Sequence, residues 1–512
     1  MKKIEKKNWI IGGVAAAVLL VGAVLIFYFY SIRPLDLYGQ TVRADAAEYT
    51  LTENVKIDLD DLIAALSQLT RLKKLDLGPY QVEVRETDKL RAAFPNAELT
   101  YLTYVSLYGD RVLPDTAALD LSDRDLSDLT QLREALPYLK NLKEVQSTGT
   151  VIPRKELDAL RKDFPGVTFK MVSSVEAFGS TLHDNITSLD LKSKSLDVAA
   201  LKEGLALLPA LEEVDLRGQR FTPEEQLELA KAFPEVAFGW EVELAGQTYD
   251  SYTEDLDLSG RKGITTALIR ERAPLFPKMT RLDMSDCGID NEEMAALRAD
   301  LPGVKVVWRL HLGQWSLKTD AVAFSVLIYN YNHKRLTSKD IEVLKYCTDL
   351  QALDLGHQAV TDISVIGDYL PELRILILVD NAVSDLTPVA KLKHLHYIEL
   401  FVNSIQLDDL SPLAACKELV DVNVSYLYSV TDFSPLFDLP LLERLWMEHT
   451  KVSADQLNTL RERYPNATII TQGTGSIDQG WRVHERYDAM IWMYHHPDEC
   501  KDLAPEFKKY DR

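Results

Sequence analysis

The sequence predicts an α/β solenoid whose parallel β-sheet lines a concave face and whose short helices form the convex face. Three recurring patterns carry this prediction. A phrase with two central apolar residues recurs five times between Leu350 and Met447, at steps of 23, 22, 24 and 23 residues. Between these pairs lies a second phrase, in which an aspartate stands two residues before a serine or threonine. A third phrase ends in proline at steps of 70, 69 and 68 residues, at Pro95, Pro165, Pro234 and Pro302.

The spacing of these phrases identifies the repeat. A period of about 20 to 29 residues with the pattern L-x-x-L-x-L is typical of leucine-rich repeats, in which each repeat is one strand and a return segment. A single repeat cannot bury its own apolar face, so neighbouring repeats must stack. Because 69 is three times 23, the long phrase indicates blocks of three fused repeats. We therefore expect one unbroken solenoid from about Leu51 to Ile470.

The chain divides into six ranges by these patterns. We expect a cytoplasmic tail at 1–8, a transmembrane signal-anchor at 9–30 and a spacer at 31–50. Blocks of about 69 residues follow at 51–328, then compact single repeats at 329–473, then a C-terminal capping tail at 474–512.

The signal-anchor prediction rests on an uncharged apolar run from Trp9 to Tyr30. About 22 residues at 1.5 Å each span roughly 33 Å, enough for a hydrocarbon core of about 30 Å. Lysines at positions 2, 3, 6 and 7 precede the run and are expected to hold the N-terminus in the cytoplasm. A cleaved signal peptide is the alternative, but no small-x-small cleavage site follows the run. The chain is thus expected to be a single-pass protein of the cell membrane with an extracytoplasmic C-terminal part.

The return segments of the blocks are of two kinds. After the second strand, apolar residues follow a helical period behind Thr222-Pro223 or Asp290, which suit a helix cap and first turn. After the third strand, apolar and polar residues alternate around Gly246 or Gly313. One return in three is therefore predicted to be a β-hairpin excursion.

The returns of the C-terminal repeats are shorter. We expect serine or threonine at their helix N-caps, with proline at the first helical position after three of them. These cap residues are Ser364, Thr387, Ser411 and Ser434. The aspartates that precede them could bind calcium or take part in catalysis, but an Asx turn explains them more simply. They are Asp362, Asp385, Asp409 and Asp432.

Charge and cysteine content limit the class of protein. The formal net charge of -21 argues against a nucleic-acid partner, since no basic stripe offsets it. The four cysteines show no metal-binding or disulfide spacing. Cys347 and Cys416 are three repeats apart, so we expect them to be equivalent, small, buried side chains.

The stretch from about Leu350 to Thr450 resembles the leucine-rich repeats of internalins. Asn381 and Asn403 keep the asparagine with which that family bonds the turn backbone, whereas Gln358, Leu427 and Thr450 replace it. These departures predict a broken ladder and irregular curvature. The resemblance implies a curved solenoid that binds other macromolecules outside a bacterial cell. The whole chain also looks like membrane-anchored extracytoplasmic leucine-rich repeat proteins of Gram-positive bacteria.

The concave face supplies the candidate binding site. In x-L-x-L-x the leucines point into the core, so the intervening side chains point out of the sheet. Several of these are apolar or aromatic, and contiguous exposed apolar surface marks contact sites. The alternative is that the C-terminal tail or a partner copy covers them. The candidate binding residues are Ile375, Ile377, Val379, Tyr397, Glu399, Phe401, Asn423, Tyr426, Arg444 and Trp446.

The tail after Gly473 is predicted to carry a helix that caps the last open repeat edge, with Trp481, His484, Tyr487 and Ile491 on one face. Metal binding is the alternative reading of His484, His495, His496, Asp498 and Cys500. No nucleophile, phosphate-loop or dinucleotide motif occurs elsewhere. We therefore expect neither catalysis nor a cofactor.

These observations favour a membrane-anchored protein that binds a protein or a surface glycan through its concave face. A cell-envelope scaffold that self-associates or recruits envelope proteins is the alternative function. A metal-dependent hydrolase built on the tail is a third and weaker possibility.

Overall fold

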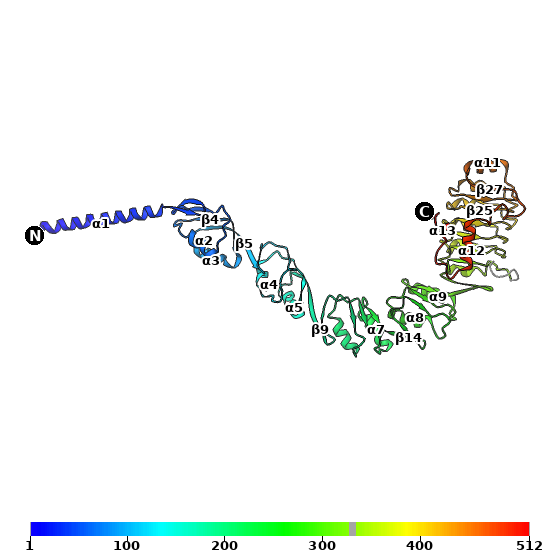
Figure 1. The fold of residues 1–512 in the computed structure, drawn as a ribbon, viewed down its shortest axis with the longest axis horizontal. Coiled ribbons are helices and arrows are strands. Elements are labelled where there is room, and N and C mark those ends of the chain that lie inside the picture. The colour runs from blue at the N-terminus through cyan, green and yellow to red at the C-terminus, as the bar shows by residue number, and fades with distance from the viewer. Residues whose placement is uncertain (1, 327–333, 511–512) are drawn as a thin grey trace. The chain divides into compact units, whose positions relative to one another are not determined.

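The computed structural model describes residues 2–326 and 334–510, with the side chains of residues 2–15 outside the description. The chain forms two compact units, whose elements are labelled in Figure 1. Unit 1 comprises Met1–Leu189 and Lys194–Glu212, and unit 2 comprises Asp190–Ser193 and Glu213–Arg512. Each unit is described separately below.

Unit 1 begins with helix α1 (Lys2–Ser31). The large apolar side chains of this helix between Val18 and Tyr30 are exposed. Within the described part of the chain, no helix combines the length and apolar character needed to cross a membrane. The transmembrane helix thus stays a prediction from the sequence.

After α1, unit 1 contains a hairpin and two repeat blocks. The hairpin pairs β1 (Pro34–Leu37) with β2 (Gln40–Arg43). The first block orders β3 (Glu48–Thr50), β4 (Lys74–Glu83), β5 (Glu98–Leu107) and β6 (Asp110–Val112), with α2 (Leu59–Leu66), η1 (Val84–Glu86) and α3 (Thr87–Ala93) as returns. The second orders β7 (Ala118–Asp120), β8 (Glu144–Pro153), β9 (Thr168–Ala177) and β10 (Ser180–His183), with α4 (Thr130–Ala135), η2 (Leu136–Tyr138) and α5 (Arg154–Asp163). Strand β11 (Ser188–Asp190) and helix α6 (Val198–Leu205) follow. Two apolar cores follow the blocks, and the second of them includes Val105 and Leu107 at the end of β5.

Unit 2 contains further blocks of parallel strands. Strand β12 (Glu213–Asp215) pairs with β13 (Ala237–Gly239), and β16 (Asp255–Asp257), β17 (Arg281–Asp283) and β18 (Lys305–Val307) form a second group. The returns are α7 (Pro223–Ala232), α8 (Thr266–Arg272), η3 (Ala273–Leu275) and α9 (Asn291–Asp300). Two hairpins, β14 (Glu241–Leu244) with β15 (Gln247–Asp250) and β19 (Arg309–Leu312) with β20 (Trp315–Lys318), follow the third strands.

A seven-stranded parallel sheet ends the solenoid. Its strands run in chain order: β21 (Ala323–Ser325), β22 (Ala352–Asp354), β23 (Ile375–Ile377), β24 (Tyr397–Glu399), β25 (Asp421–Asn423), β26 (Arg444–Trp446) and β27 (Thr468–Ile470). Their returns stack alongside in the same order: η4 (Glu342–Tyr346), α10 (Ser364–Tyr369), η5 (Thr387–Lys391), η6 (Ser411–Ala415), η7 (Ser434–Asp438) and α11 (Ala454–Arg463). The tail adds α12 (Glu485–His495) and α13 (Pro505–Lys508). Leu355, Leu378, Leu400 and Val424 are fully buried behind neighbouring strands, as the repeat requires.

The predicted β-excursions are present. Strand β6 pairs antiparallel with β5, and β10 with β9, in addition to the two hairpins of unit 2. In the β14–β15 hairpin, Ala245 (φ 48°) and Gly246 (φ 81°) are both left-handed, as a type I′ turn demands. These excursions have a consequence that the repeat period does not reveal. Parallel pairing stops between the blocks of each unit, so the prediction of one unbroken solenoid is wrong.

The helix caps are partly as predicted. Thr222 caps α7 in a capping box with Glu225, and Asp290 caps α9. In the C-terminal returns the capping residue is not the serine or threonine. Instead, the backbone N–H of the serine or threonine donates to the side chain of the aspartate two residues before it. These bonds are 2.7 to 2.9 Å long in the four turns that begin at positions 362, 385, 409 and 432. The Asx-turn interpretation of the aspartates is therefore confirmed, and the N-cap assignment to serine or threonine is wrong.

The turn ladder is more complete than predicted. Asn403 donates to the carbonyl oxygens of Leu378 and Leu400, both at 2.8 Å, and accepts from the N–H of Val383 at 3.1 Å. Gln358 takes part as well, because its Oε1 accepts from the N–H of Leu336 at 2.8 Å. The longer amide reaches the same backbone groups, so the break predicted at Gln358 is wrong. Cys347 and Cys416 are fully buried and free, as expected.

The ladder yields a testable stability difference. Asn403→Ala takes the side-chain partner from the Leu400 carbonyl and the Val383 N–H, whereas the Leu378 carbonyl keeps a bond from Asn381 at 3.3 Å. A buried polar group left unpaired costs about 1–3 kcal/mol. We expect a loss of about 2–3 kcal/mol in the free energy of unfolding of unit 2, measured by urea denaturation followed by tryptophan fluorescence. All tryptophans except Trp9 lie in unit 2, so this fluorescence reports on it. The matched control is Thr450→Ala, since Thr450 makes one local bond to Met447; an equal loss in both variants would contradict the ladder's role.

Candidate binding surface

The concave face of the seven-stranded sheet is covered. Nine of the ten candidate binding residues are buried, and only Tyr426 keeps partial exposure. The prediction that these side chains face solvent is wrong for those nine. They are Ile375, Ile377, Val379, Tyr397, Glu399, Phe401, Asn423, Arg444 and Trp446.

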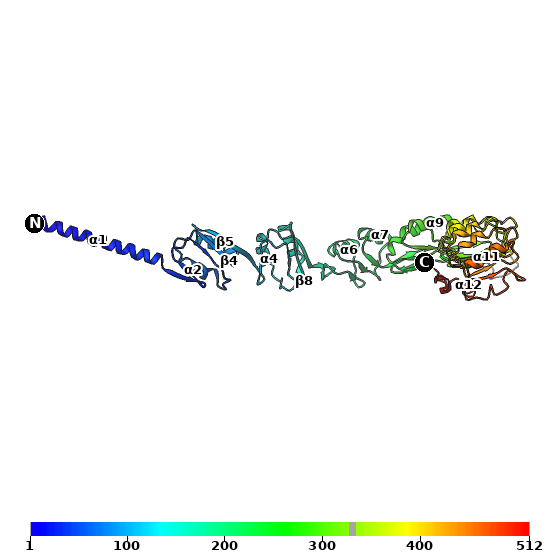
Figure 2. The same ribbon diagram turned by 90° about the horizontal axis from the view of Figure 1, so that it is seen from above.

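The C-terminal tail provides the cover. Helices α12 and α13, red in Figure 1, lie alongside the strands of the sheet (Figure 1, Figure 2). Tail side chains form one apolar cluster with the concave residues, and all of its members are buried. The tail contributes Trp481, Met490, Met493, Tyr494, Cys500, Leu503 and Phe507. This cluster removes from water the apolar columns that the sequence placed on the open face.

The prediction that the tail caps the last repeat edge is wrong, because the tail packs against the concave face of the sheet instead. Helix α12 begins only at Glu485, with His484 as its N-cap, so Trp481 precedes the helix. The buried residues of α12 are Arg486, Met490, Met493 and Tyr494, while the predicted Tyr487 and Ile491 are half-buried and pack against the same cluster. The tail therefore lies across the sheet, and its buried face is set by contacts with the concave columns.

A buried ionic centre joins tail and sheet, consisting of Asp421, Arg444 and Arg486. Arg444 donates to both carboxylate oxygens of Asp421, through Nε at 2.9 Å and a terminal nitrogen at 2.7 Å. Arg486 of the tail does the same at 2.8 and 2.7 Å. Burial alone would raise the pKa of Asp421, but the two guanidinium groups outweigh it and lower that pKa. Arg486 also donates to Glu443 and to the Tyr510 hydroxyl, at 2.8 and 2.7 Å.

Further polar contacts hold the segment before α12. The Trp481 indole donates to Oε1 of Glu399 at 2.8 Å, and the Tyr397 hydroxyl donates to the same oxygen. The Asn423 amide donates to the carbonyl of Ser476 at 2.8 Å. The Trp446 indole donates to the carbonyl of Asp478 at 2.8 Å. Three strands of the sheet, β24, β25 and β26, thus contact the tail through oriented hydrogen bonds as well as apolar packing.

Other carboxylates of the concave face are poorly matched by the tail. Among the described residues, neither oxygen of the fully buried Glu448 has a hydrogen-bond partner, and burial raises its pKa. Oε2 of Glu399 has none either, and the nearest guanidinium nitrogen, of Arg482, is 3.8 Å away. Burial raises the pKa of Asp354 to about 6, although Ser325 and the N–H of Gly356 donate to it. The concave face is therefore acidic beneath the tail.

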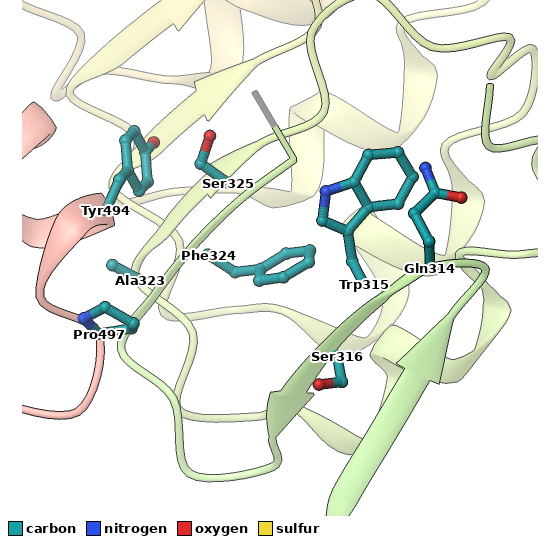
Figure 3. Close-up of a pocket in the computed structure, with 8 residues that line it drawn as sticks. All are labelled: Gln314, Trp315, Ser316, Ala323, Phe324, Ser325, Tyr494 and Pro497. Carbon is teal, nitrogen blue, oxygen red and sulfur yellow. The ribbon is translucent and has the colours of Figure 1, made fainter. Parts of the chain in front are cut away.

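A cavity of about 300 Å³ remains where the end of α12 meets β20 and β21 (Figure 3). Trp315, Phe324, Tyr494 and Pro497 supply most of its apolar wall. The buried hydroxyl of Tyr494 lacks a hydrogen-bond partner among the described residues. Tail and sheet thus fit less closely at this end than around Asp421.

A second surface lies at the rim of the sheet, where the chain leaves β24, β25 and β26. We call it the rim patch, and it consists of Val402, Ile405, Tyr426, Tyr428 and His449. The exposed fractions of Val402, Ile405 and Tyr428 are 43, 76 and 53%. The Tyr426 ring lies 4.5 Å from that of His449 and 6.0 Å from that of Tyr428. Consecutive rungs of the solenoid therefore present one apolar and aromatic surface.

The backbone of the rim patch is strained. Val402, Tyr426 and His449 have φ of 58°, 58° and 51°, in the left-handed region. Asp286 and Asp380 occupy the same turn position in other repeats, and aspartate tolerates this region. A β-branched valine there is unusual, because its side chain crowds the backbone.

The sequence identified this rim only in part. Tyr426 was predicted as a binding residue, whereas Ile405 and Tyr428 were not recognised. A usable pattern existed, since FVNSI and SYLYS carry large apolar side chains in turn segments that are ordinarily polar.

The side chains proposed for the alternative metal site in the tail do not gather into a cluster of possible ligands. Cys500 is buried and directs its thiol to the carbonyl of Asp502, and His496 contacts the carbonyl of Trp492. Across the described ranges, no group of three or more histidine, cysteine, aspartate or glutamate side chains could hold a metal ion.

Comparisons with known proteins return solved structures of low sequence identity and low TM-score. No protein-family model matches the chain, and no curated protein matches its sequence. An internalin (InlF) from Listeria monocytogenes is 16% identical with a TM-score of 0.26, covering 76% of this chain and 89% of that one. Internalin C2 from the same organism is 20% identical with a TM-score of 0.23, covering 36% and 79%. The Leptospira interrogans leucine-rich repeat protein LIC12759 is 16% identical with a TM-score of 0.22, covering 83% and 96%.

The leucine-rich repeat architecture rests on the chain's own geometry. Parallel three-residue strands recur at the repeat period, their aliphatic pairs are buried, and side-chain amides bond the turn backbone between rungs. The chain is therefore a leucine-rich repeat protein.

Asp354 gives a pH dependence with a definite sign. Its pKa of about 6 lies above the ordinary value of 3.8, so the folded state binds the proton more tightly than the unfolded state. Stability therefore falls as the pH rises from about 4 to 6, and the penalty is complete above that range. In Asp354→Asn this penalty is absent, and Asn can keep the bonds to Gly356 and Ser325. We expect the stability advantage of the variant over the parent to grow by about 1–1.5 kcal/mol between pH 5 and pH 7.5, measured by urea denaturation.

The difference between parent and variant isolates Asp354 from other groups. Burial lowers the pKa of His484, which acts in the opposite direction, but it is common to both chains. The matched control is Asp432→Asn, because hydrogen bonds lower the pKa of this exposed aspartate and it does not titrate in the same window. A parent and an Asp354→Asn variant with parallel pH profiles would contradict the prediction.

Proposed function

We propose that this protein is a non-catalytic, membrane-anchored repeat protein that binds another protein outside the cell membrane through the rim patch. The observation that carries the proposal is the exposure of apolar and aromatic side chains on three consecutive rungs. Contiguous exposed apolar surface on a folded domain marks contact sites, and aromatic side chains dominate their binding energy. The concave face itself is unavailable to a partner while the tail lies on it.

Backbone strain supports the same surface. Holding a non-glycine residue in the left-handed region costs about 1–3 kcal/mol, and such strain gathers at functional sites. Val402 and Tyr426 carry this strain while their side chains contribute little to the core. An aspartate at either position would relieve it, as in the neighbouring repeat at Asp380. The strained residues are thus better explained by what they contact outside the chain.

The chemistry of the rim patch favours a protein over a nucleic acid. The patch itself contains no lysine or arginine, and the chain carries a formal net charge of -21. Phosphate backbones are bound by clustered cations, which this surface does not offer. Self-association into a cell-envelope scaffold and binding of a surface glycan are the competing outcomes of the test below.

The anchoring part of the proposal is supported by α1. Residues 9–30 contain no charged side chain, and the large apolar side chains from Val18 to Tyr30 make no buried contacts within the chain. Such a surface needs cover from an apolar environment. The lysines that precede it favour a cytoplasmic N-terminus.

Site-specific photocrosslinking on the full-length chain in membranes tests the rim patch. A photoreactive aromatic residue replaces Tyr428 in one chain and Tyr369 in another, since Tyr369 is exposed to a similar extent, at 49%, on helix α10. We expect a discrete product of higher mass from position 428, and at least a tenfold loss of it when Ile405→Asp is added. Ile405 is 76% exposed, so the added charge leaves the core intact.

The identity of the product separates the competing functions. A foreign protein supports the proposal, a dimer of this chain supports the scaffold, and a carbohydrate adduct supports glycan binding. Equal products from positions 428 and 369, or a product unaffected by Ile405→Asp, would contradict a specific site at the rim.

The anchor is tested by extraction of membranes with alkaline carbonate. We expect the parent chain to stay in the membrane pellet, because an apolar span of about 22 residues does not leave the bilayer. Leu20→Arg combined with Val24→Arg places two charges in the run, each costing about 2.5–3.5 kcal/mol at the bilayer centre. Release of this variant and retention of a Tyr38→Arg control support the anchor, whereas release of the parent refutes it.

A further inference from the structure

The concave face of the seven-stranded sheet carries more carboxylates than the cations of the C-terminal tail pair with. The sheet contributes four buried carboxylates and one buried arginine to this face, namely Asp354, Glu399, Asp421, Glu448 and Arg444. We infer that this face is a receptor surface for a basic, aromatic segment of another protein, and that the C-terminal tail is a resident occupant which such a segment displaces. The inference concerns a surface other than the rim patch and does not depend on it.

The tail neutralises only part of this charge. Arg486 pairs fully with Asp421, but Arg482 only approaches Glu399, at 3.8 Å. Residues 474–512 as a whole carry eight acidic and six basic side chains, so the tail brings no net positive charge. Buried carboxylates are stable only when cations or hydrogen bonds compensate them. An occupant with more cations would therefore fit this face better.

Glu448 shows most directly what the tail lacks. The side chain is fully buried, and neither carboxylate oxygen has a partner among the described residues. It points at Gly473, where a Cβ would collide with the carboxylate. Asp478 of the tail, another carboxylate, adds repulsion and raises the pKa of Glu448 further. A guanidinium or ammonium group in place of Asp478 would instead pair with Glu448.

The chain is built so that the tail can leave. Residues 471–480, TQGTGSIDQG, form the only covalent link between β27 and the tail, and they contain three glycines. Glycine lowers the cost of rearranging the backbone at such a link. The middle of the tail leaves the cavity beside Tyr494 and Pro497 (Figure 3).

The contacts of the tail define the chemistry of the displacing segment. It must bring a guanidinium to Asp421 and an aromatic N–H donor to Glu399, because these buried carboxylates would otherwise lose the bonds from Arg486 and Trp481. It must also offer apolar side chains where Met490, Met493 and Phe507 now lie. A second copy's tail has the same charge deficit as the first, so a separate basic protein is the favoured occupant.

Two labelled peptides test the inference on the full-length chain. One has the sequence of residues 474–510, and the other has the same sequence with Asp478→Arg. Because the tethered tail competes at an effective concentration in the millimolar range, binding is measured by fluorescence anisotropy on the parent and on Arg486→Met, in which the tail is weakened. We expect the Asp478→Arg peptide to bind at least tenfold more tightly than the unmodified peptide, and hydrogen exchange in α12 of the chain to rise when it binds.

A matched pair of variants tests the role of Glu448 on the concave face. Glu448→Gln is expected to abolish the difference between the two peptides, whereas Glu372→Gln, an exposed glutamate that pairs with Arg374, is expected to preserve it. The inference is overturned if the affinities of the two peptides do not differ on the parent and do not differ on Arg486→Met. It is also overturned if the amides of α12 stay protected from hydrogen exchange during binding. Concentration-dependent dimers without peptide preference would show exchange of tails between copies and would overturn the choice of a basic partner. The rim experiment reads a different position, so either result can fail alone.

Discussion

The seven-stranded sheet has to be covered on both of its faces, and the organisation of unit 2 follows from this requirement. On the inner side, aliphatic residues of each repeat, such as Leu355 and Leu378, are buried against the stacked returns. On the concave side, Ile375, Tyr397 and Trp446 present as much apolar surface again. Parallel sheets are ordinarily covered on both faces, since their strands are apolar throughout. A solenoid of single repeats provides only one cover, so the second comes from the C-terminal tail.

The second cover is attached by charge as well as by apolar contact. Asp421 accepts four hydrogen bonds from two guanidinium groups, one from the sheet and one from the tail. Such a centre sets the register of the tail, because a shifted Arg486 would lose its bonds to Asp421 and Glu443 and leave a buried guanidinium unpaired in a dry interface. The same interface leaves Glu448 without a partner and a cavity beside Tyr494. The tail thus fits the concave face closely at Asp421 and poorly at Glu448 and Tyr494, as expected of a segment that binds specifically but can be replaced.

The blocks and the compact repeats handle their ends differently. Each block closes with an antiparallel excursion, which prevents its last parallel strand from pairing with the next block in the same unit. The compact repeats lack such excursions and stack into one sheet. Repetition predicted both kinds of return correctly, because alternation and helical spacing are local properties. The interruption of the sheet was not predictable from period alone, since two halves with one period can pair or not pair according to what lies between them.

The sequence by itself determined the repeat: its spacing places Leu355, Leu378, Leu400 and Val424 in the core, the aspartates in their turns and the amides of Asn381 and Asn403 on the backbone. These outcomes depend on neighbours within one or two repeats, so a local pattern suffices to predict them. Only the tertiary structure decided that the concave columns are buried and that Val402, Ile405 and Tyr428 form the exposed surface. The physical reason is that burial of the concave face depends on a tail that follows the repeats in sequence and belongs to no repeat itself. Its docking depends on the long-range contacts of Arg486 and Trp481 with strands 65 and 82 residues away.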